Sequence, residues 1–407
     1  MLSDLQEKSL GMYDELAGRE YRCTLRKCCC SAGGRREERR TDTPRVIGID
    51  PGTVSIDVCG LDDGAVFLDR SLPTADALAN PSVIVDVLDA AHRIAPLDLV
   101  AGPSGYGLPL IRAQDVTDDD LRLAYLAPEG EAGGIGGLRT LMRALRTSPL
   151  PVVLTPGVVH LPSVPAHRKV NRVDMGTADK VCAVALAVHE EAKRRGCGER
   201  GVSLILLELG GAFTAAIAVD RGRIVDGLGG TSGPLGMRAA GALDGEVAYL
   251  AGSISKRLLF SGGASAIAGT PDAPIESIAT PGTPRARLAW DAYLESAVKA
   301  VALLTAIVPS ASDVILSGRL AGVAGVRQAI AARLAAARID APVRALTGFA
   351  TFAKAAAQGA ALVADGLAGG RASTLVETLA IRGACGTVLD HLHLVDPAAA
   401  RARLGIA

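Results

Sequence analysis

The sequence predicts an α/β fold built from two similar halves. Three observations support this prediction: strands and helices occur in a mixed order, each half opens with a run of three strands, and the 47 glycines of the 407-residue chain cluster in a few loops. Glycine makes up only ~7% of an average protein, so the excess points to loops with special roles. Aromatic residues are only 3% of the chain, so we expect a core of Ala, Val, Leu and Ile.

The first half begins with three short strands. Residues 46–50 form an apolar strand that ends in Asp50, and residues 51–53 form a tight turn. Strands over residues 54–61 and 65–72 follow, and glycine-containing turns join them as in antiparallel hairpins. Helices and strands complete this half: a helix over 81–94, a strand over 97–101, a helix over 137–147, a strand over 151–155 and a helix over 173–195.

The second half repeats this opening in outline. A strand over residues 202–209, a turn over 210–212 and strands over 213–220 and 224–227 follow in the same order. The remaining elements are a proline-rich loop over 269–285, a helix over 288–307, a strand over 313–317, and helices over 322–336 and 352–367. The repetition indicates an internal duplication.

We expect two lobes with an additional segment at each end. Residues 1–44 hold Arg-rich, Glu-rich and Cys-rich stretches without sustained periodicity. Such a composition buries too little apolar surface to fold, so we expect a disordered leader. Its four cysteines lack the paired spacing of a zinc site. The first lobe covers residues 45–200, the second covers 201–362, and residues 363–407 are expected to pack back on the lobes.

Charge and hydropathy exclude several classes of function. Lys and Arg number 43, as do Asp and Glu, so the chain lacks the basic excess of a nucleic-acid binder. It has no run of ~18 apolar residues that would span a membrane, and its N-terminus lacks the apolar stretch of a secretory signal. We therefore expect a cytoplasmic protein with a small-molecule substrate, no nucleic-acid or membrane partner, and cysteines that remain thiols.

Three glycine-containing loops follow apolar strands, and backbone amides in such loops can bind phosphate oxygens. They are Asp50-Pro51-Gly52-Thr53, Glu208-Leu209-Gly210-Gly211-Ala212-Phe213-Thr214 and Ser317-Gly318-Arg319. A single glycine of this kind usually marks only a turn. Two of these loops, however, occupy equivalent places in two similar halves, so a cleft between the halves would receive both.

Two carboxylates end the strands beside the first two loops. A magnesium ion that carries nucleotide phosphates is typically held by one or two carboxylates, so Asp50 and Glu208 are candidate metal ligands. The alternative is that each carboxylate caps turn amides, as Asp often does.

Taken in order, these motifs resemble those of the superfamily of acetate kinase, sugar kinases, actin and the heat-shock chaperone ATPases. IGIDPGTVSIDVCGLDDG is similar to its first phosphate motif, LLELGGAFTAAIAVDRGRIVDG to the second, VILSGRLAGV to the adenosine motif and AAAQGAALVADGLAGG to the helix after it. The resemblance spans residues 46–370. Within the superfamily, RGRIVDGLGGTSGPLG resembles a loop of butyrate kinase, and NRVDMGTADK is typical of a family labelled predicted butyrate kinases.

The resemblance implies a two-lobed actin-like (ribonuclease H-like) ATPase fold with a duplicated core, and ATP and Mg²⁺ bound in the cleft between the lobes. The residues that would bind the nucleotide and its metal ion are Asp50, Gly52, Thr53, Glu208, Gly210, Gly211, Thr214 and Gly318. In acetate and butyrate kinases an arginine after the second phosphate motif steadies the transferring phosphoryl group, and Arg238 occupies a similar place. The alternative for Arg238 is an ordinary salt bridge.

The sequence departs from the carboxylate kinases at two positions. Glu208 stands where they carry a histidine opening the second motif, and Met175 stands near the place of another. Either a different donor replaces these histidines, or the chemistry differs. Asp174 and Asp179, with Lys180, are candidates for the base and its charge partner toward a hydroxyl acceptor. The alternative is that these aspartates only favour a helix start.

The acceptor site has three further candidates. Gly105 lies in a loop suited to a substrate wall, Arg112 follows that loop, and Arg172 is suited to holding an anionic substrate. Two functions stay open: an ATP-dependent kinase of a small acceptor such as a short-chain carboxylate, or an ATPase switch or regulatory protein that phosphorylates no metabolite. Kinases of this type tend to be dimers, so the resemblance also implies a homodimer.

Overall fold

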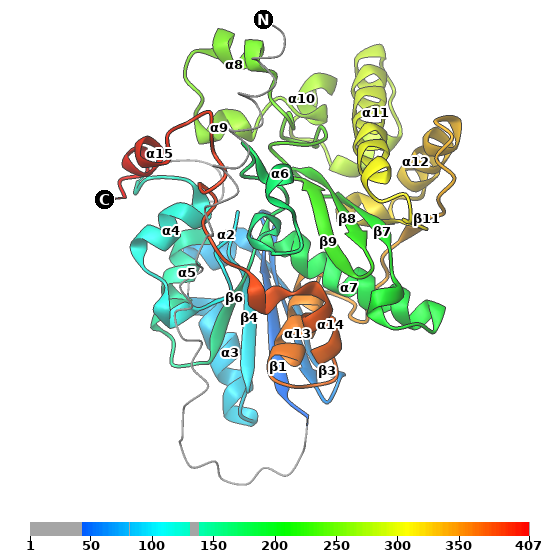
Figure 1. The fold of residues 1–407 in the computed structure, drawn as a ribbon. Helices are drawn as coiled ribbons and strands as arrows, with labels where there is room; N and C mark the ends of the chain where they lie inside the picture. The colour runs from blue at the N-terminus through cyan, green and yellow to red at the C-terminus, as the bar shows by residue number, and fades with distance from the viewer. Residues whose placement is uncertain (1–42, 81, 131–137, 407) are drawn as a thin grey trace, which may run out of the picture. The chain divides into compact units, whose positions relative to one another are not determined.

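Two β-sheets of the same construction form the centre of the protein (Figure 1). The computed structural model describes residues 43–80, 82–130 and 138–406. The first sheet consists, in spatial order, of β3 (Ala65–Pro73), β2 (Ser55–Asp62), β1 (Arg45–Pro51), β4 (Leu99–Pro103), β6 (Val152–Thr155) and β5 (Ile111–Arg112). The second consists of β9 (Arg223–Leu228), β8 (Thr214–Asp220), β7 (Leu204–Leu209), β10 (Val314–Ser317) and β11 (Val343–Ala345).

The two sheets share one topology. In the first sheet β1 pairs antiparallel with β2 and parallel with β4. In the second sheet β7 pairs antiparallel with β8 and parallel with β10. The next strands outward, β6 and β11, are parallel to their neighbours as well. The predicted α/β fold with a duplicated core is therefore confirmed.

Helices cover the sheets and connect their strands. In the first half they are α2 (Thr74–Ala79), α3 (Ser82–Ile94), α4 (Asp118–Tyr125), α5 (Leu138–Thr147), α6 (Ala166–Lys169) and α7 (Ala178–Arg195). Those that follow are α8 (Gly245–Ala251), α9 (Lys256–Leu259), α10 (Ala264–Ala268), α11 (Pro284–Ile307), α12 (Ala324–Ala336), α13 (Ala355–Leu367), α14 (Ser373–Leu379) and α15 (Pro397–Arg403). None of them, over the described residues, is long and apolar enough to cross a bilayer.

The second sheet is buried on both faces, and alternate residues of β7 show it. Leu204 and Leu206 belong to the apolar core that contains α7, whereas Ile205 and Leu207 belong to the core that contains α11. This alternation follows from the two-residue period of a β-strand. It explains why β7 reads as a continuous apolar run.

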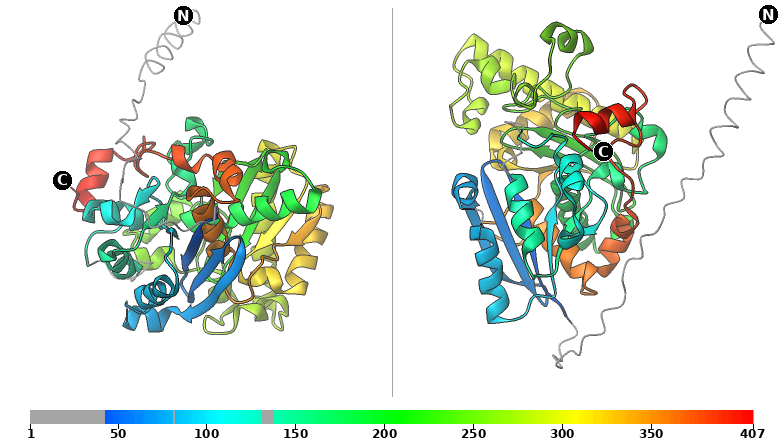
Figure 2. Two further views of the ribbon diagram at one scale, coloured as in Figure 1. Left: turned by 90° about the horizontal axis from the view of Figure 1, so that it is seen from below. Right: turned by 90° about the vertical axis from the view of Figure 1, so that its left-hand side faces the viewer.

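Helix α13 packs on the first sheet, although it follows the second sheet in the chain. It lies against β1, β2 and β4 and along α7, and the orange C-terminal helices lie beside the blue strands in both views of Figure 2. Glycines allow this approach. A Cβ added at Gly48 in β1 would overlap the backbone of α13, and one at Gly359 in α13 would overlap the Cys182 carbonyl in α7. The boundary predicted at residue 362 thus falls within a helix that packs on the first lobe.

Some elements differ from the predictions. The helix predicted over 173–195 begins only at Ala178, because Gly176 has a φ of 125° that no α-helix contains. Short strands and helices without a clear period were not predicted, among them β11, α14 and α15. The predicted leader, with its cysteine cluster, lies outside the described residues except for residues 43 and 44. Cys59 and Cys182 are buried, as their apolar surroundings predict.

The contact between α13 and α7 predicts a position-specific effect of one methyl group. We expect Gly359→Ala to lower the free energy of unfolding by about 2 kcal/mol, because the new Cβ forces two backbones apart. The matched change Gly325→Ala in α12 has space, since its nearest neighbour would lie 3.7 Å away. That variant should be neutral or stabilised by up to about 1 kcal/mol. Urea unfolding followed by circular dichroism compares the two, and equal effects would contradict the packing described.

Candidate functional site

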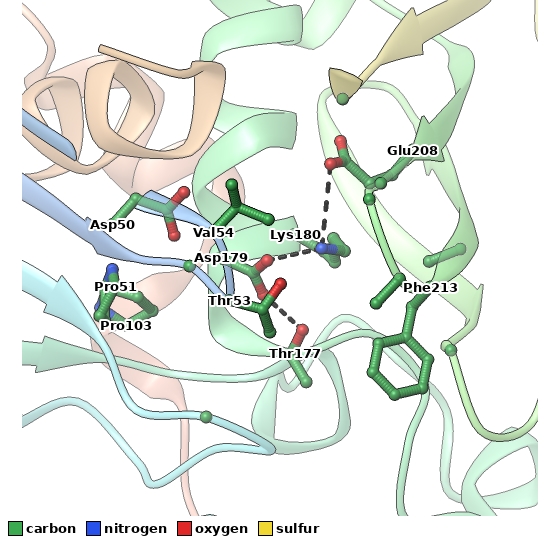
Figure 3. Close-up of a pocket in the computed structure, with 18 of the residues that line it drawn as sticks. Asp50, Pro51, Thr53, Val54, Pro103, Thr177, Asp179, Lys180, Glu208 and Phe213 are labelled. Carbon is green, nitrogen blue, oxygen red and sulfur yellow. Dashed lines mark hydrogen bonds and ion pairs between the residues drawn. The ribbon is translucent and has the colours of Figure 1, made fainter. Parts of the chain in front are cut away.

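A cavity of about 200 Å³ lies where the ends of β1 and β7 face one another (Figure 3). It is found within the compact unit formed by residues Thr41–Ala407. The loop after β1 lines one side and the loop after β7 the other. The two loops nearly touch, since a Cβ added at Gly211 would lie 3.8 Å from Cγ2 of Val54. The two loops predicted from equivalent places of the halves are therefore brought together.

Most of the predicted site residues line this cavity. They are Asp50, Gly52, Thr53, Gly105, Asp174, Asp179, Glu208, Gly210, Gly211 and Gly318. The predicted residues outside the lining are Arg112, Arg172, Thr214 and Arg238.

Glycine is needed at several turns of the cavity wall. The amide of Gly52 donates to the carbonyls of Asp50 and Ser55, both at 3.0 Å, which closes the loop after β1. A Cβ at Gly52 would lie 2.7 Å from Nζ of Lys354. Gly318 has a φ of 82°, and a Cβ there would lie 2.6 Å from the carbonyl oxygen of Leu209. Larger residues would fill the space that these turns leave open.

Four loop residues that line the cavity have backbone amides without a hydrogen-bond acceptor. Within the described residues, the N–H groups of Thr53 and Val54 in the first loop and of Gly211 and Ala212 in the second have no hydrogen-bond acceptor. Nearly all backbone N–H groups of folded proteins are paired. Successive free amides in a turn form a concave site for anions. The arrangement is therefore suited to phosphate oxygens that both loops contact.

One charge cluster lies at the ends of β1 and β2. Asp50 and Asp57 are directly opposite in the strand register and both are buried. Nζ of Lys354, the residue before α13, lies 2.7 Å from Oδ2 of Asp57 and 3.7 Å from Oδ2 of Asp50. Burial raises the pKa of Asp50 to about 7, with Asp179 and Asp57 adding to the rise against Lys354. Burial alone would lower the pKa of Lys354, but the two carboxylates outweigh it and raise that pKa.

A second charge cluster joins α7 to β7 (Figure 3). Nζ of Lys180 donates to Oδ2 of Asp179 at 2.5 Å and lies 4.0 Å from Oε1 of Glu208. The Thr177 hydroxyl donates to the other oxygen of Asp179. Ser317, at the end of β10, donates to Oε2 of Glu208. Burial raises the pKa of Asp179, but Lys180 and Thr177 outweigh it, so the pKa is lowered and the group stays ionised.

Asp174 lines the cavity, but neighbouring loop residues already donate hydrogen bonds to both of its carboxylate oxygens. One oxygen accepts from the amide of Gly176 at 3.2 Å, and the other accepts from the amide and hydroxyl of Thr231, each at 2.9 Å. Its carbonyl accepts from the amide of Gly229 at 3.2 Å. Asp174 thus ties the start of α7 to residues 229–231. Burial raises its pKa despite these donors.

The four predicted residues outside the lining have other surroundings. The hydroxyl of Thr214 lies 3.5 Å from that of Tyr293, inside the second lobe. Arg238 is exposed, but its amide donates to the carbonyl of Ala212 at 3.0 Å, so its backbone adjoins the second loop. Arg112 forms an exposed ion pair with Asp115 at 2.8 Å. Arg172 is exposed and borders a separate surface groove beside α11.

The residues at β1 and β2 fit a divalent cation bound together with phosphate. Oδ1 of Asp57 is buried and has no hydrogen-bond partner within the described residues. Carboxylate oxygens are the ligands Mg²⁺ prefers, and it usually takes only one or two of them beside phosphates and water. No group of three or more His, Cys, Asp or Glu side chains in the described residues could hold a metal by itself. The site thus suits a metal–phosphate complex better than a bare ion.

Sequence reasoning did not find Asp57 and Lys354. Asp57 lies near the start of the otherwise apolar strand β2, and a charged residue in such a run was the available signal. Lys354 lies close to Asp57 only because α13 returns to the first sheet. Phe260 also lines the cavity and stacks edge-on against Phe213 at 4.7 Å between ring centroids, with no motif to mark it.

The raised pKa of Asp50 predicts a pH-dependent effect of Asp50→Asn in magnesium-free buffer. A carboxyl whose pKa rises on folding destabilises the protein increasingly as the pH climbs from 3.8, its unfolded value, through about 7. Asp50→Asn should therefore raise the free energy of unfolding more at pH 8 than at pH 5. The two effects should differ by on the order of 2 kcal/mol. The exposed control Asp340→Asn should show no such difference in urea unfolding. A variant equally destabilised at both pH values would contradict the burial cost.

Comparison with solved structures gives the same fold. A propionate kinase from Francisella tularensis subsp. tularensis SCHU S4 superimposes with a TM-score of 0.57 and 15% sequence identity, over 78% of this chain and 98% of that chain. An acetate kinase from Entamoeba histolytica has a TM-score of 0.52 and 12% identity, over 72% and 87%. The acetate kinase of Porphyromonas gingivalis has a TM-score of 0.50 and 14% identity, over 70% and 86%. At such identities the likeness shows the fold alone, which these kinases share with this chain.

A family match covers most of the chain. No curated protein matches the sequence. Residues 48–394 match the family described as "Protein of unknown function (DUF1464)". Because this range is well over half of the 407 residues, the chain belongs to the DUF1464 family.

Proposed function

We propose that the protein is an ATP-dependent phosphotransferase that acts on a small molecule, and that its acceptor is a short-chain carboxylate, as in butyrate kinase-like enzymes. The observation that carries the proposal is a set of four cavity-lining residues, from two equivalent loops, whose backbone amides have no hydrogen-bond acceptor within the described residues. Amides of Thr53 and Val54 bind phosphate oxygens from one side, and those of Gly211 and Ala212 bind them from the other. Gly318 lies against the adenosine.

Asp50 is the residue placed to hold magnesium, with Asp57 behind it. The metal, when bound, neutralises charge on the nucleotide phosphates. The predicted ligand Glu208 has a weaker case, since Ser317 donates to one of its oxygens and the ammonium of Lys180 lies 4.0 Å from the other. Lys354 keeps the two aspartates paired with a cation in the absence of a metal ion.

The acceptor side of the cavity is apolar. Pro103, Tyr106 and Leu138 line it from the first lobe, and Phe213 and Phe260 from the second. Such a wall excludes water from the phosphoryl group, which a kinase requires to favour transfer over hydrolysis. It also favours an acceptor with an apolar tail over a sugar. The backbone of Arg238 adjoins the second loop through its hydrogen bond to Ala212, and we propose that its guanidinium steadies the transferring phosphoryl group.

Nucleotide entry requires the lobes to move. The cavity volume of about 200 Å³ is below the ~300–1,000 Å³ of typical ligand pockets. Separation of the loops after β1 and β7 would admit the nucleotide, and closure would then seal the site. Superposition on a propionate kinase and an acetate kinase supports a kinase, without identifying the acceptor.

A nucleotide-dependent switch without metabolite kinase activity is the second candidate. It is favoured by one observation: the described residues that line the cavity include no histidine, and Arg238 lies outside the lining. A switch needs nucleotide binding and closure, but no acceptor. ADP release in the absence of acyl phosphate distinguishes it from the kinase.

The proposal predicts acyl phosphate formation. With ATP, Mg²⁺ and a panel of short-chain carboxylates, hydroxylamine should trap a hydroxamate for at least one acid, in step with ADP release. Asp50→Asn and Arg238→Ala should each lower kcat at least about 100-fold, because the first removes the proposed metal ligand and the second removes the guanidinium proposed to steady the transferring phosphoryl group. Arg223→Ala, an exposed arginine of β9 outside the cavity lining, should leave kcat unchanged.

Other results separate the alternatives. ADP release that no acid stimulates, without hydroxamate, would overturn the carboxylate acceptor and favour the switch. Absence of ATP binding by the folded protein would overturn both candidates.

A further inference from the structure

Lys180 is a partly buried cation whose hydrogen-bonding capacity is only partly used. Its side chain is 15% exposed and lines the cavity. An ammonium group has three N–H donors. Within the described residues it makes one side-chain hydrogen bond, to Asp179, and its 4.0 Å separation from Glu208 is too long for a second. Two donors are thus available to a group that enters the cavity.

The position of Lys180 relative to the two loops indicates an anionic ligand. Figure 3 shows its amine between Asp179 and Glu208, with the first loop at Thr53 and Val54 on one side and Phe213 of the second loop on the other. The unpaired amides of both loops line the same cavity. Amides and a buried ammonium together match a multiply charged oxyanion such as phosphate.

The other cations of the cavity are engaged elsewhere. Lys354 is 42% exposed and donates to Ser55 and Asp57. Arg319 is 52% exposed and pairs with Glu276 at 2.7 Å. Lys180 is therefore the least exposed of the three cationic side chains in the described lining.

The two positions at which carboxylate kinases carry histidines offer no cationic donor here. Glu208 is an acid, and Met175 is buried in the apolar core with 1% exposure. Phosphate binding at this end of the cavity consequently needs a donor from another position. Lys180 lies five residues after Met175 and within 4.0 Å of Glu208.

We propose that Lys180 binds the terminal phosphate of a nucleoside triphosphate in the cleft and so takes the place of the missing histidines. The inference rests on the proposed nucleotide binding. Asp179, held by Thr177, fixes the ammonium on α7. The terminal phosphate oxygens accept from the two donors that Asp179 leaves available, so the lysine distinguishes a triphosphate from a diphosphate.

The test compares two nucleotides rather than activities. Titration calorimetry gives the Kd of Mg²⁺·AMP-PNP and of Mg²⁺·ADP for the full-length protein and for Lys180→Met. Loss of the ammonium should weaken AMP-PNP binding about ten- to a hundredfold, as for a charge-assisted hydrogen bond. ADP binding should change less than about threefold. The matched control Lys299→Met removes an exposed lysine paired with Glu295 on α11, and it should alter neither Kd.

A second variant covers the case in which Lys180→Met fails to fold. Asp179→Asn keeps the ammonium of Lys180 and removes the charge of its partner. The affinity for AMP-PNP, relative to that for ADP, should therefore stay the same or rise. Equal loss of both nucleotides in the folded variants, or no loss of AMP-PNP in Lys180→Met, would overturn the inference. Wild-type protein that binds neither nucleotide would overturn it together with the proposed function. Selective loss of AMP-PNP in a protein that phosphorylates no acid would support Lys180 while refuting the kinase.

Discussion

The pairing of three carboxylates with two lysines is the interaction on which the cleft depends. Asp50 and Asp57 are buried and Asp179 is partly buried. An unpaired buried carboxylate costs roughly several kcal/mol in folding free energy. Lys354 compensates the first two and Lys180 the third. Lys354 immediately precedes α13 and Lys180 lies in the first turn of α7, so the positions of these two helices determine where the charges lie.

Close helix packing makes this arrangement possible. Helices α7 and α13 lie against each other and close to the first sheet because Gly48 and Gly359 leave room for the neighbouring backbone. A chain poor in aromatic residues and rich in Ala and Gly can bring helices this close together. The same sheets direct the loops after β1 and β7 to one cavity, which residues with acceptor-free amides line from both loops. Helix packing, charge pairing and the proposed phosphate site therefore depend on one another.

The sequence was sufficient for the fold and for the loops, because apolar runs that end in glycine turns are local patterns. The equivalent positions of Asp50 and Glu208 also followed from the repeated strand order. The sequence was insufficient for contacts between distant segments. Lys354 forms an ion pair with Asp57 only because α13 returns to the first sheet. Asp174 was a candidate base, yet its oxygens accept from Gly176 and Thr231, which periodicity does not reveal. Arg238 was placed near the second loop, and its backbone lies there while its side chain is exposed.

The central claim is that the facing loops after β1 and β7 bind nucleotide phosphates through their free amides. Hydrogen–deuterium exchange with mass spectrometry, with and without saturating Mg²⁺·AMP-PNP, measures this directly. Peptides that cover residues 51–55 and 209–213 should exchange quickly in the free protein and slow markedly with nucleotide, while a peptide within α12 stays unchanged. Bound nucleotide without slower exchange in either loop would contradict the account.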